Sequence, residues 1–201
     1  MKLYSAAASP FARKVRVCLL ELGIADQVEE LDAATTPVAP NDMLIMQNPL
    51  GKIPCLVRDD GSAIYDSRVI THYLNNLVNG DLYPTGPRLW ETLTLEATAD
   101  GMMEAAVLMV YEKRVRPEEM VYNVWLEAQW YKVERALDAL ESGWAGHLDG
   151  PLDMAQIGVG VVLEYLDFRH DDRDWRKGRG ALTKWQAEFA KRDAMQKTRP
   201  A

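Results

Sequence analysis

A serine and a proline stand together where the sequence changes from an apolar stretch to a helical pattern. Ser9 falls at the N-cap of the predicted helix and Pro10 at its first position, where the missing proline N–H would have no partner anyway. A helix N-terminus carries partial positive charge and unpaired N–H groups, and both favour anions. The junction suits a thiolate or a phosphate, although Ser9 taken alone would also serve as an ordinary N-cap.

The first 77 residues predict a small mixed sheet with helices around it. Strand, helix and strand follow within about thirty residues, so the first two strands should be parallel. Pro54 cannot donate to a strand ladder and belongs at a strand start or edge, and Asp60-Gly61 predicts a hairpin turn. The predicted order is βαβ, a short helix, then ββα, with strands at 2–7, 27–32, 53–57 and 63–65 and helices at 10–22, 41–47 and 67–77.

After a predicted linker at 78–84, the sequence predicts only helices. Apolar residues recur at helical spacing, and Asp153 with Gln156 predicts a capping box at the most apolar helix. The fold class is an α/β N-terminal domain at 1–77 and an all-α C-terminal domain at 85–201. Its helices are expected at 88–115, 117–143, 152–168 and 181–194.

Composition narrows the classes of function. The net charge of −7 over 201 residues argues against non-specific nucleic-acid binding, which needs a basic surface. No apolar run has the length of a membrane span. The two cysteines make no disulfide framework and favour a reducing cytoplasm, and the three histidines show no metal-ligand spacing. We expect a cytoplasmic protein with no metal and no membrane or nucleic-acid partner.

Four stretches in this order resemble the glutathione S-transferase family, and the resemblance covers nearly the whole chain. The long helix also resembles bacterial, cytosolic, serine-type members. The resemblance implies a thioredoxin-like first domain that binds glutathione as co-substrate, and a homodimer. The stretches are SPFARKVRV (9–17), NPLGKIPCLV (48–57), YDSRVITHYL (65–74) and GPLDMAQIGVGVVLEYLDFR (150–169).

The resemblance also implies roles in binding glutathione. Ser9 would be catalytic and would donate its hydroxyl to the glutathione sulfur, lowering the thiol pKa from about 8.5 towards the nucleophilic thiolate. The backbone of Ile53, next to a cis Pro54, would pair with the cysteinyl part. Lys52 would lie near the glycyl carboxylate. The γ-glutamyl end would bind at the predicted helix start formed by Asp66 and Ser67.

The residues of the second-substrate pocket are harder to assign. Phe11 and Tyr111 are candidate walls, and Met102 and Met109 suit an adaptable apolar pocket, although methionines on such a helix also suit core packing. This pocket consists of side chains that the fold does not determine, so the sequence does not identify the electrophile.

Several other residues have simpler interpretations. The basic run Arg13, Lys14 and Arg16 is expected on the solvated face of its helix. Cys18 and Cys55 are expected as small buried hydrophobic residues. Tyr4, in mid-strand, is expected to be structural, and the implied homodimer would place Arg68 at its interface.

The resulting hypothesis is an enzyme that conjugates glutathione to a small electrophile, as in detoxification. Members of the family that transfer thiols carry cysteine where Ser9 stands here, so the resemblance argues against disulfide exchange. Two alternatives stay open. One is a non-catalytic or regulatory binding module of the same fold, and the other is a glutathione-dependent isomerase, dehalogenase or peroxidase.

Overall fold

The computed structural model describes residues 1–200, which form two compact units. The first unit comprises Met1–Leu89 together with the segment from Asp193 onward, and the second comprises Trp90–Arg192. The domain boundaries expected from the sequence, with a linker at 78–84, remain a prediction. The units divide the chain at Leu89, and they group the segment from Asp193 with the first unit.

The first unit is built on a four-stranded mixed sheet with the order β2-β1-β3-β4. The strands β1 and β2 are parallel, whereas β3 pairs antiparallel with both β1 and β4, as the sequence predicts. The strand β3 starts one residue after Pro54, which has no N–H to donate. The strands are β1 (Lys2–Ser5), β2 (Glu29–Asp32), β3 (Cys55–Val57) and β4 (Ala63–Ile64).

The core of this unit lies between the sheet and two helices that contact each other, α1 and α3. Leu3 and Leu56 of the sheet, Val15 of α1 and Ile70 of α3 are all buried. Gly23 ends α1 with a φ of +69°, a conformation that side chains disfavour. The helical elements are α1 (Pro10–Glu21), η1 (Ala25–Gln27), α2 (Asp42–Ile45) and α3 (Ser67–Leu77).

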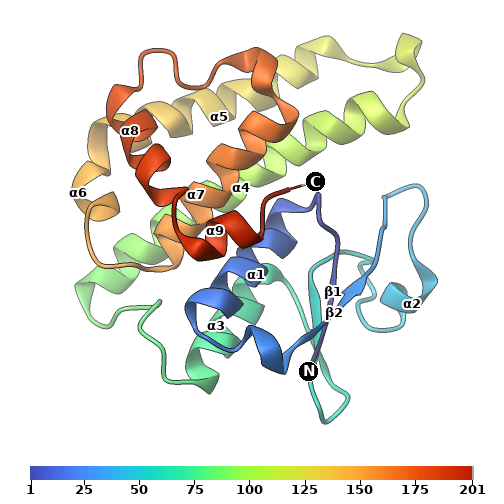
Figure 1. Ribbon diagram of the computed structural model, residues 1–201. Helices are drawn as coiled ribbons and strands as arrows, with labels where there is room; N and C mark the ends of the chain where they lie inside the picture. Colours follow the sequence, from blue (N-terminus) through green and yellow to red (C-terminus); the bar gives the residue numbers. More distant parts are fainter. Residues whose placement is uncertain (201) are drawn as a thin grey trace. The chain divides into compact units, whose positions relative to one another are not determined.

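The short helix α9 (Asp193–Lys197) also belongs to the first unit, where it packs against α1 (Figure 1). The sequence predicts one helix over 181–194. The structure instead ends α8 at Phe189 and starts α9 at Asp193. The prediction of one continuous helix is wrong because the apolar residues of α9 pack in the first unit, which requires the chain to turn before them.

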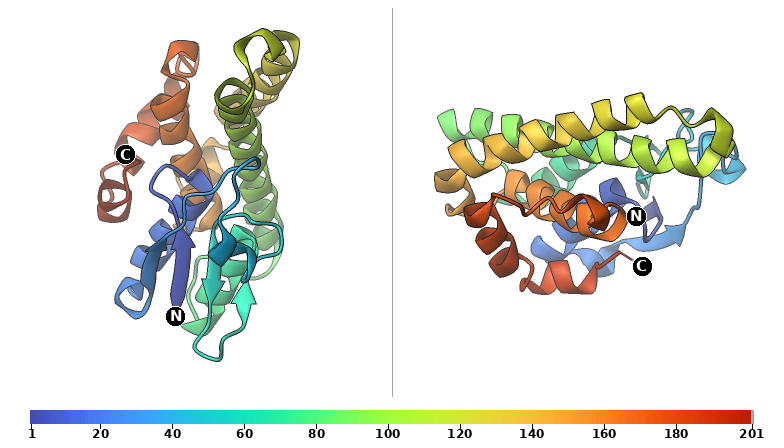
Figure 2. Two further views of the ribbon diagram at one scale, coloured as in Figure 1. Left: turned by 90° about the vertical axis from the view of Figure 1, so that its right-hand side faces the viewer. Right: turned by 90° about the horizontal axis from the view of Figure 1, so that it is seen from above.

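The second unit is entirely helical. Figures 1 and 2 show α4 and α5 running alongside each other in opposite directions, and most residues of α7 itself are buried. A Cβ at Gly158 of α7 would meet the Ala99 Cβ at 3.2 Å, so glycine permits close packing against α4. The elements are α4 (Pro87–Val115), η2 (Glu118–Met120), α5 (Asn123–Gly143), α6 (Ala145–Leu148), α7 (Met154–Arg169), η3 (Asp171–Arg173) and α8 (Gly180–Phe189).

One boundary in this unit differs from the prediction of a helix over 117–143. Pro117 precedes a 3-10 turn, and α5 begins only at Asn123. The Tyr122 N–H, one residue earlier, donates to Oε1 of Glu112 at 3.2 Å. This hydrogen bond joins the last turns of α4 to the residue before α5. It holds the segment between the two helices in a non-helical conformation.

Candidate functional site

Ser9 caps α1, as its position before Pro10 predicts. Its Oγ accepts the Ala12 N–H at 3.3 Å, and Pro10 is buried at the first helical position. In the described chain, the first turn of α1 contains no acidic residue that would offset the positive end of the helix. A hydroxyl that accepts one bond still has its own proton to donate. Ser9 can therefore cap α1 and donate to an anion at the same time.

Ile53 and Pro54 lie just before the first paired residue of β3, and the peptide bond between them is cis. The preceding loop is held by Asn48, which is buried. Its Nδ2 donates to the Lys52 carbonyl at 2.7 Å, and its Oδ1 accepts the Leu50 N–H at 3.0 Å. No role of Asn48 is predicted from the sequence, although the Asn-Pro pair marks the turn. This side chain fixes the backbone that leads into Ile53, while the Lys52 side chain is exposed.

Asp66 caps α3, with Ser67 as its first helical residue. The Asp66 carboxylate accepts the Arg68 N–H at 3.1 Å and the Arg68 guanidinium at 2.8 and 3.3 Å. The Ser67 residue is buried, and its carbonyl accepts the Thr71 hydroxyl at 3.0 Å. The Asp66 side chain is 54% exposed, so solvent and a cationic group can still reach its carboxylate. Arg68, expected at a dimer interface, thus contacts Asp66 within its own chain.

The pKa of Asp66 reflects opposing effects. Burial of the carboxyl would raise the pKa, but the hydrogen bond and positive charge of Arg68, with the backbone N–H groups of Arg68 and Val69, outweigh it. The pKa therefore lies below the ordinary value for aspartate. At neutral pH the residue presents a carboxylate at the start of α3.

The four candidates for a second-substrate pocket differ in exposure. Phe11, in the first unit, and Tyr111, in the second, are half-buried. Met102 and Met109 of α4 are 2% and 0% exposed, so they pack in the core of the second unit. Their assignment to a pocket stays a prediction.

The expectation that the basic run on α1 is solvated is wrong for two of its three residues. Arg13 is 2% exposed and Lys14 is fully buried, whereas Arg16 is half-buried. A signal was present in the sequence, because Ala12, Val15, Val17, Cys18 and Leu19 spread small and apolar residues around most of the helix. Such a helix packs on nearly every side and leaves little surface for charges.

The buried cysteines match the interpretation as small hydrophobic residues. Cys18 and Cys55 are buried and form no disulfide, and burial raises the pKa of Cys55 to about 11. The thiolate is the reactive form of cysteine, so Cys55 is unreactive at neutral pH. Among the described residues, no group of three or more His, Cys, Asp or Glu is placed to hold a metal ion. Within the same residues, no helix is long and apolar enough to cross a membrane.

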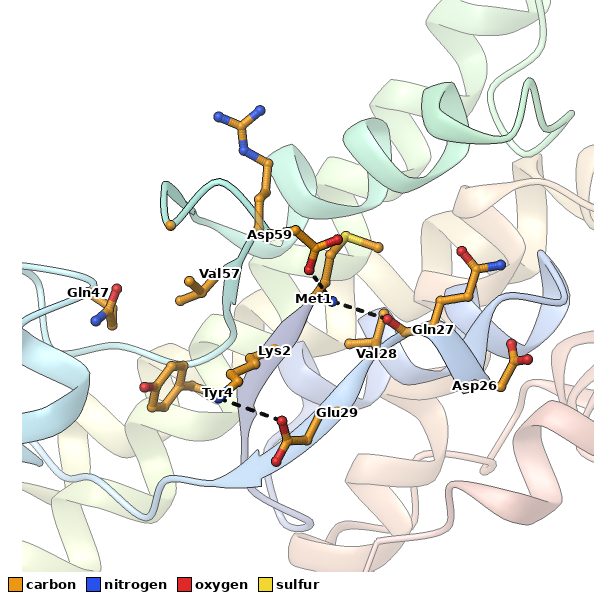
Figure 3. Close-up of a pocket in the computed structure, with 12 residues that line it drawn as sticks. Met1, Lys2, Tyr4, Asp26, Gln27, Val28, Glu29, Gln47, Val57 and Asp59 are labelled. Atoms are coloured by element: carbon orange, nitrogen blue, oxygen red, sulfur yellow. Dashed lines mark hydrogen bonds and ion pairs between the residues drawn. The ribbon is translucent and has the colours of Figure 1, made fainter.

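A groove of about 730 Å³ lies on the first unit away from these residues (Figure 3). The half-buried Tyr4 and Val57 line it, and two ion pairs join other residues of its lining. The N-terminal amine lies 2.8 Å from Asp59, and Lys2 lies 3.7 Å from Glu29. Its described lining contains none of the predicted site residues. The groove is therefore separate from the candidate site, and Tyr4 is part of its wall.

Comparison with known proteins assigns the family. The profile of the glutathione S-transferase N-terminal domain matches residues 8–77, and that of the C-terminal domain matches residues 123–187. The chain belongs to the glutathione S-transferase family. It is 33% identical over 209 residues to the uncharacterized GST-like protein YibF of Escherichia coli (strain K12), with 100% of this chain and 98% of the relative covered.

Solved structures agree with this assignment. A glutathione transferase family member from Pseudomonas fluorescens Pf-5 with bound glutathione has a TM-score of 0.97 and 42% identity, covering 100% of this chain and 98% of the other. A structure of a family member from the same organism, with bound S-(propanoic acid)-glutathione, has a TM-score of 0.92 and 41% identity, covering 100% and 99%. These matches confirm the predicted fold class, a thioredoxin-like domain followed by an all-α domain.

Proposed function

We propose that this chain is a glutathione transferase, which activates the thiol of glutathione and joins its sulfur to a small electrophile. The observation that carries the proposal is the Ser9 hydroxyl at the positively charged end of α1, where it keeps a proton to donate. The similar chains from Pseudomonas fluorescens bound to glutathione and to an S-substituted glutathione support the same chemistry.

In this mechanism Ser9 stabilises the thiolate and does not itself ionise. A thiol with a pKa of about 8.5 is only about 3% ionised at pH 7, and each unit by which that pKa falls corresponds to about 1.4 kcal/mol. The thiol proton leaves to solvent, and the Ser9 O–H donates to the sulfur anion that remains. The sulfur electron pair then forms a bond to the electrophilic carbon, and the leaving group departs with its own electron pair.

The remaining predicted residues would hold the rest of the tripeptide. The Asp66 carboxylate suits the ammonium of the γ-glutamyl end, and the α3 start with Ser67 suits its carboxylate. The Ile53 backbone, which lies before the paired part of β3, suits strand-like pairing with the cysteinyl part. Lys52 is exposed and suits the glycyl carboxylate. Phe11, Met102, Met109 and Tyr111 are proposed for the electrophile.

Conjugation of a generic aryl halide by the Ser9→Ala variant tests the proposal. We expect kcat/KM to fall about 100-fold, the typical effect of removing one donor to a developing or stabilised anion. Ser142→Ala is the matched control, because Ser142 is exposed on α5 and its hydroxyl donates to the Asp138 carbonyl. Equal activity in Ser9→Ala and the wild type would remove Ser9 from the mechanism.

Calorimetry separates the enzyme from a binding module. A module would bind glutathione without turning over aryl halides, epoxides or peroxides, whereas the absence of binding at millimolar glutathione would contradict the proposed site itself. Glutathione-dependent peroxide reduction, dehalogenation or isomerisation without conjugation of aryl halides would instead identify a peroxidase, a dehalogenase or an isomerase, because all of them share the thiolate.

We further propose that the protein works in detoxification as a cytoplasmic homodimer. Two buried cysteines that form no disulfide suit a reducing compartment. Two apolar residues of α3, Val69 and Leu77, are 51% and 44% exposed, which supports a partner on that helix. Light scattering tests the dimer. We expect twice the monomer mass for the wild type and a shift towards the monomer for Val69→Glu.

A further inference from the structure

The chain segment that contains α9 packs against α1 with three buried residues. Ala194 and Met195 of α9 and Thr198, which directly follows it, are 4%, 1% and 4% exposed, and the buried Arg13 of α1 forms hydrogen bonds to this segment. Figure 1 shows the two helices next to each other. More than 180 residues separate the partners in sequence, so local structure does not account for the contact.

Arg13 donates two hydrogen bonds to this segment. Its Nε donates to the Thr198 Oγ1 at 3.3 Å, and its Nη2 donates to the Met195 carbonyl at 3.1 Å. The Thr198 hydroxyl in turn donates to the Ala194 carbonyl at 2.8 Å. A guanidinium group is a fork of donors with fixed geometry, and a cation near helix carbonyls is favourable. These bonds therefore fix an orientation between α1 and α9.

Arg13 also belongs to the turn that presents Ser9. Its backbone N–H donates to the Ser9 carbonyl at 2.9 Å. Residues four apart lie on the same face of a helix, one above the other. The residue that holds α9 is thus joined to the N-cap of α1.

Burial of a charge is costly, and a well-packed apolar side chain in its place is often as stable or more so. The stability of the fold alone therefore does not explain an arginine at position 13. Directional hydrogen bonds that fix the orientation of α1 do explain it.

We propose that Arg13 is a positioning residue. By binding the Met195 carbonyl and the Thr198 hydroxyl, it fixes the first turns of α1 and so the direction in which the Ser9 hydroxyl points. The segment from Asp193 to Pro200 then contributes to glutathione binding by holding α1 in position. This inference rests on the function proposed for Ser9.

The test removes one of the two acceptors of Arg13, the Thr198 hydroxyl, in the full chain and leaves Arg13 intact. Thr198→Val keeps the shape and deletes the hydroxyl, whereas Thr198→Ser restores it. Thr183→Val is the matched control, because Thr183 of α8 likewise donates to the carbonyl four residues earlier, at 2.6 Å, and lies in the other unit. The readouts are amide hydrogen exchange of α1, glutathione affinity by calorimetry, and the pKa of the bound thiol from the ultraviolet absorbance of the thiolate.

We expect Thr198→Val to speed exchange in the first turns of α1 and to raise the bound thiol pKa by about one unit. This shift corresponds to about a tenfold loss of kcat/KM below that pKa. Thr198→Ser should restore both values and Thr183→Val should change neither. Unchanged exchange in α1, or faster exchange with an unchanged thiol pKa, would overturn the proposal. A wild type that binds glutathione without turnover would contradict the proposed enzyme, and the exchange and thiol measurements would still decide the role of Arg13.

Discussion

The N-termini of α1 and α7 are both capped by a polar side chain, yet the two caps differ in how many bonds they use. Asp153 at α7 is 1% exposed and accepts the N–H groups of Ala155 and Gln156, the Thr92 hydroxyl at 2.9 Å and a His147 ring N–H at 2.8 Å. Ser9 at α1 is half-buried and accepts one N–H at 3.3 Å.

The difference separates a structural helix start from one that can bind a ligand. We call the α7 cap closed because the Asp153 side chain accepts several donors and the Gln156 Oε1 in turn accepts the Asp153 N–H at 2.9 Å. We call the α1 cap open because the Ser9 hydroxyl still has its proton to donate and the positive end of the helix is not offset. The same local rule for beginning a helix therefore stabilises the fold in one unit and leaves a place for an anion in the other.

The largest expected effect is on stability, at the closed cap. Asp153→Ala removes the acceptor shared by two backbone N–H groups, Thr92 and His147. We expect the free energy of unfolding to fall by about 3–5 kcal/mol, because buried polar groups lose their partner. Denaturant unfolding measures it, with the exposed neighbour Asp149→Ala as a control that should stay within about 0.5 kcal/mol. A loss no larger than that of the control would show that the α7 cap is not closed in the way described.

The open cap should show the reverse pattern. Ser9→Ala removes a single cap bond, so unfolding should become easier by only about 1 kcal/mol while kcat/KM falls about 100-fold. Measuring both quantities on the same preparation tests the contrast directly. A stability loss at Ser9 as large as that at Asp153 would break the comparison and make Ser9 a structural cap.

The sequence predicts which residues cap α1 and α7, but it does not predict the distant residues that bind to the α7 cap. Ser9 before Pro10, and Asp153 three residues before Gln156, are signals contained in a few neighbouring residues, and the structure confirms both caps. Thr92 lies 61 residues from Asp153, and no local spacing shows that it donates there. The cis peptide before Pro54 was implied by the family resemblance rather than by its own neighbours.

The apolar residues around α1 signal that its charges are buried, but the partners of Arg13 are not contained in its own neighbours. A basic run on a helix usually faces solvent, and the partners that bury Arg13, Met195 and Thr198, come from the last ten residues of the chain. The division of the last predicted helix into α8 and α9 follows from that packing. Tertiary contacts outweigh helix propensity in such places, and periodicity alone does not contain them.

A third cap, at α3, lies between the two extremes. Asp66 is exposed like a binding group and is also held by Arg68. Asp66→Asn should raise KM for glutathione about tenfold with little change in kcat, because it removes the charge from one charge-assisted bond to the substrate. Asp60→Asn, at an exposed carboxylate beside Arg58, is the control. A tenfold fall in kcat with an unchanged KM would place Asp66 in the chemical step and not in binding.

The smallest effect concerns pH and follows from the same residue. The pKa of Asp66 in the folded chain lies below its ordinary value of about 3.8, which applies to the unfolded chain. The stability contributed by the pair of Asp66 with Arg68 is therefore fully present above pH 3.8. It is lost as the pH falls through the lower pKa of the folded chain. Glutathione binding that depends on this carboxylate should therefore persist down to about pH 4. Calorimetry from neutral pH to pH 4 measures it, with Asp66→Asn expected to give a weak, flat profile. A wild-type affinity that already declines near pH 5, in parallel with titration of this carboxyl, would show that Arg68 does not hold it in the charged form, and the α3 cap would then resemble neither α1 nor α7.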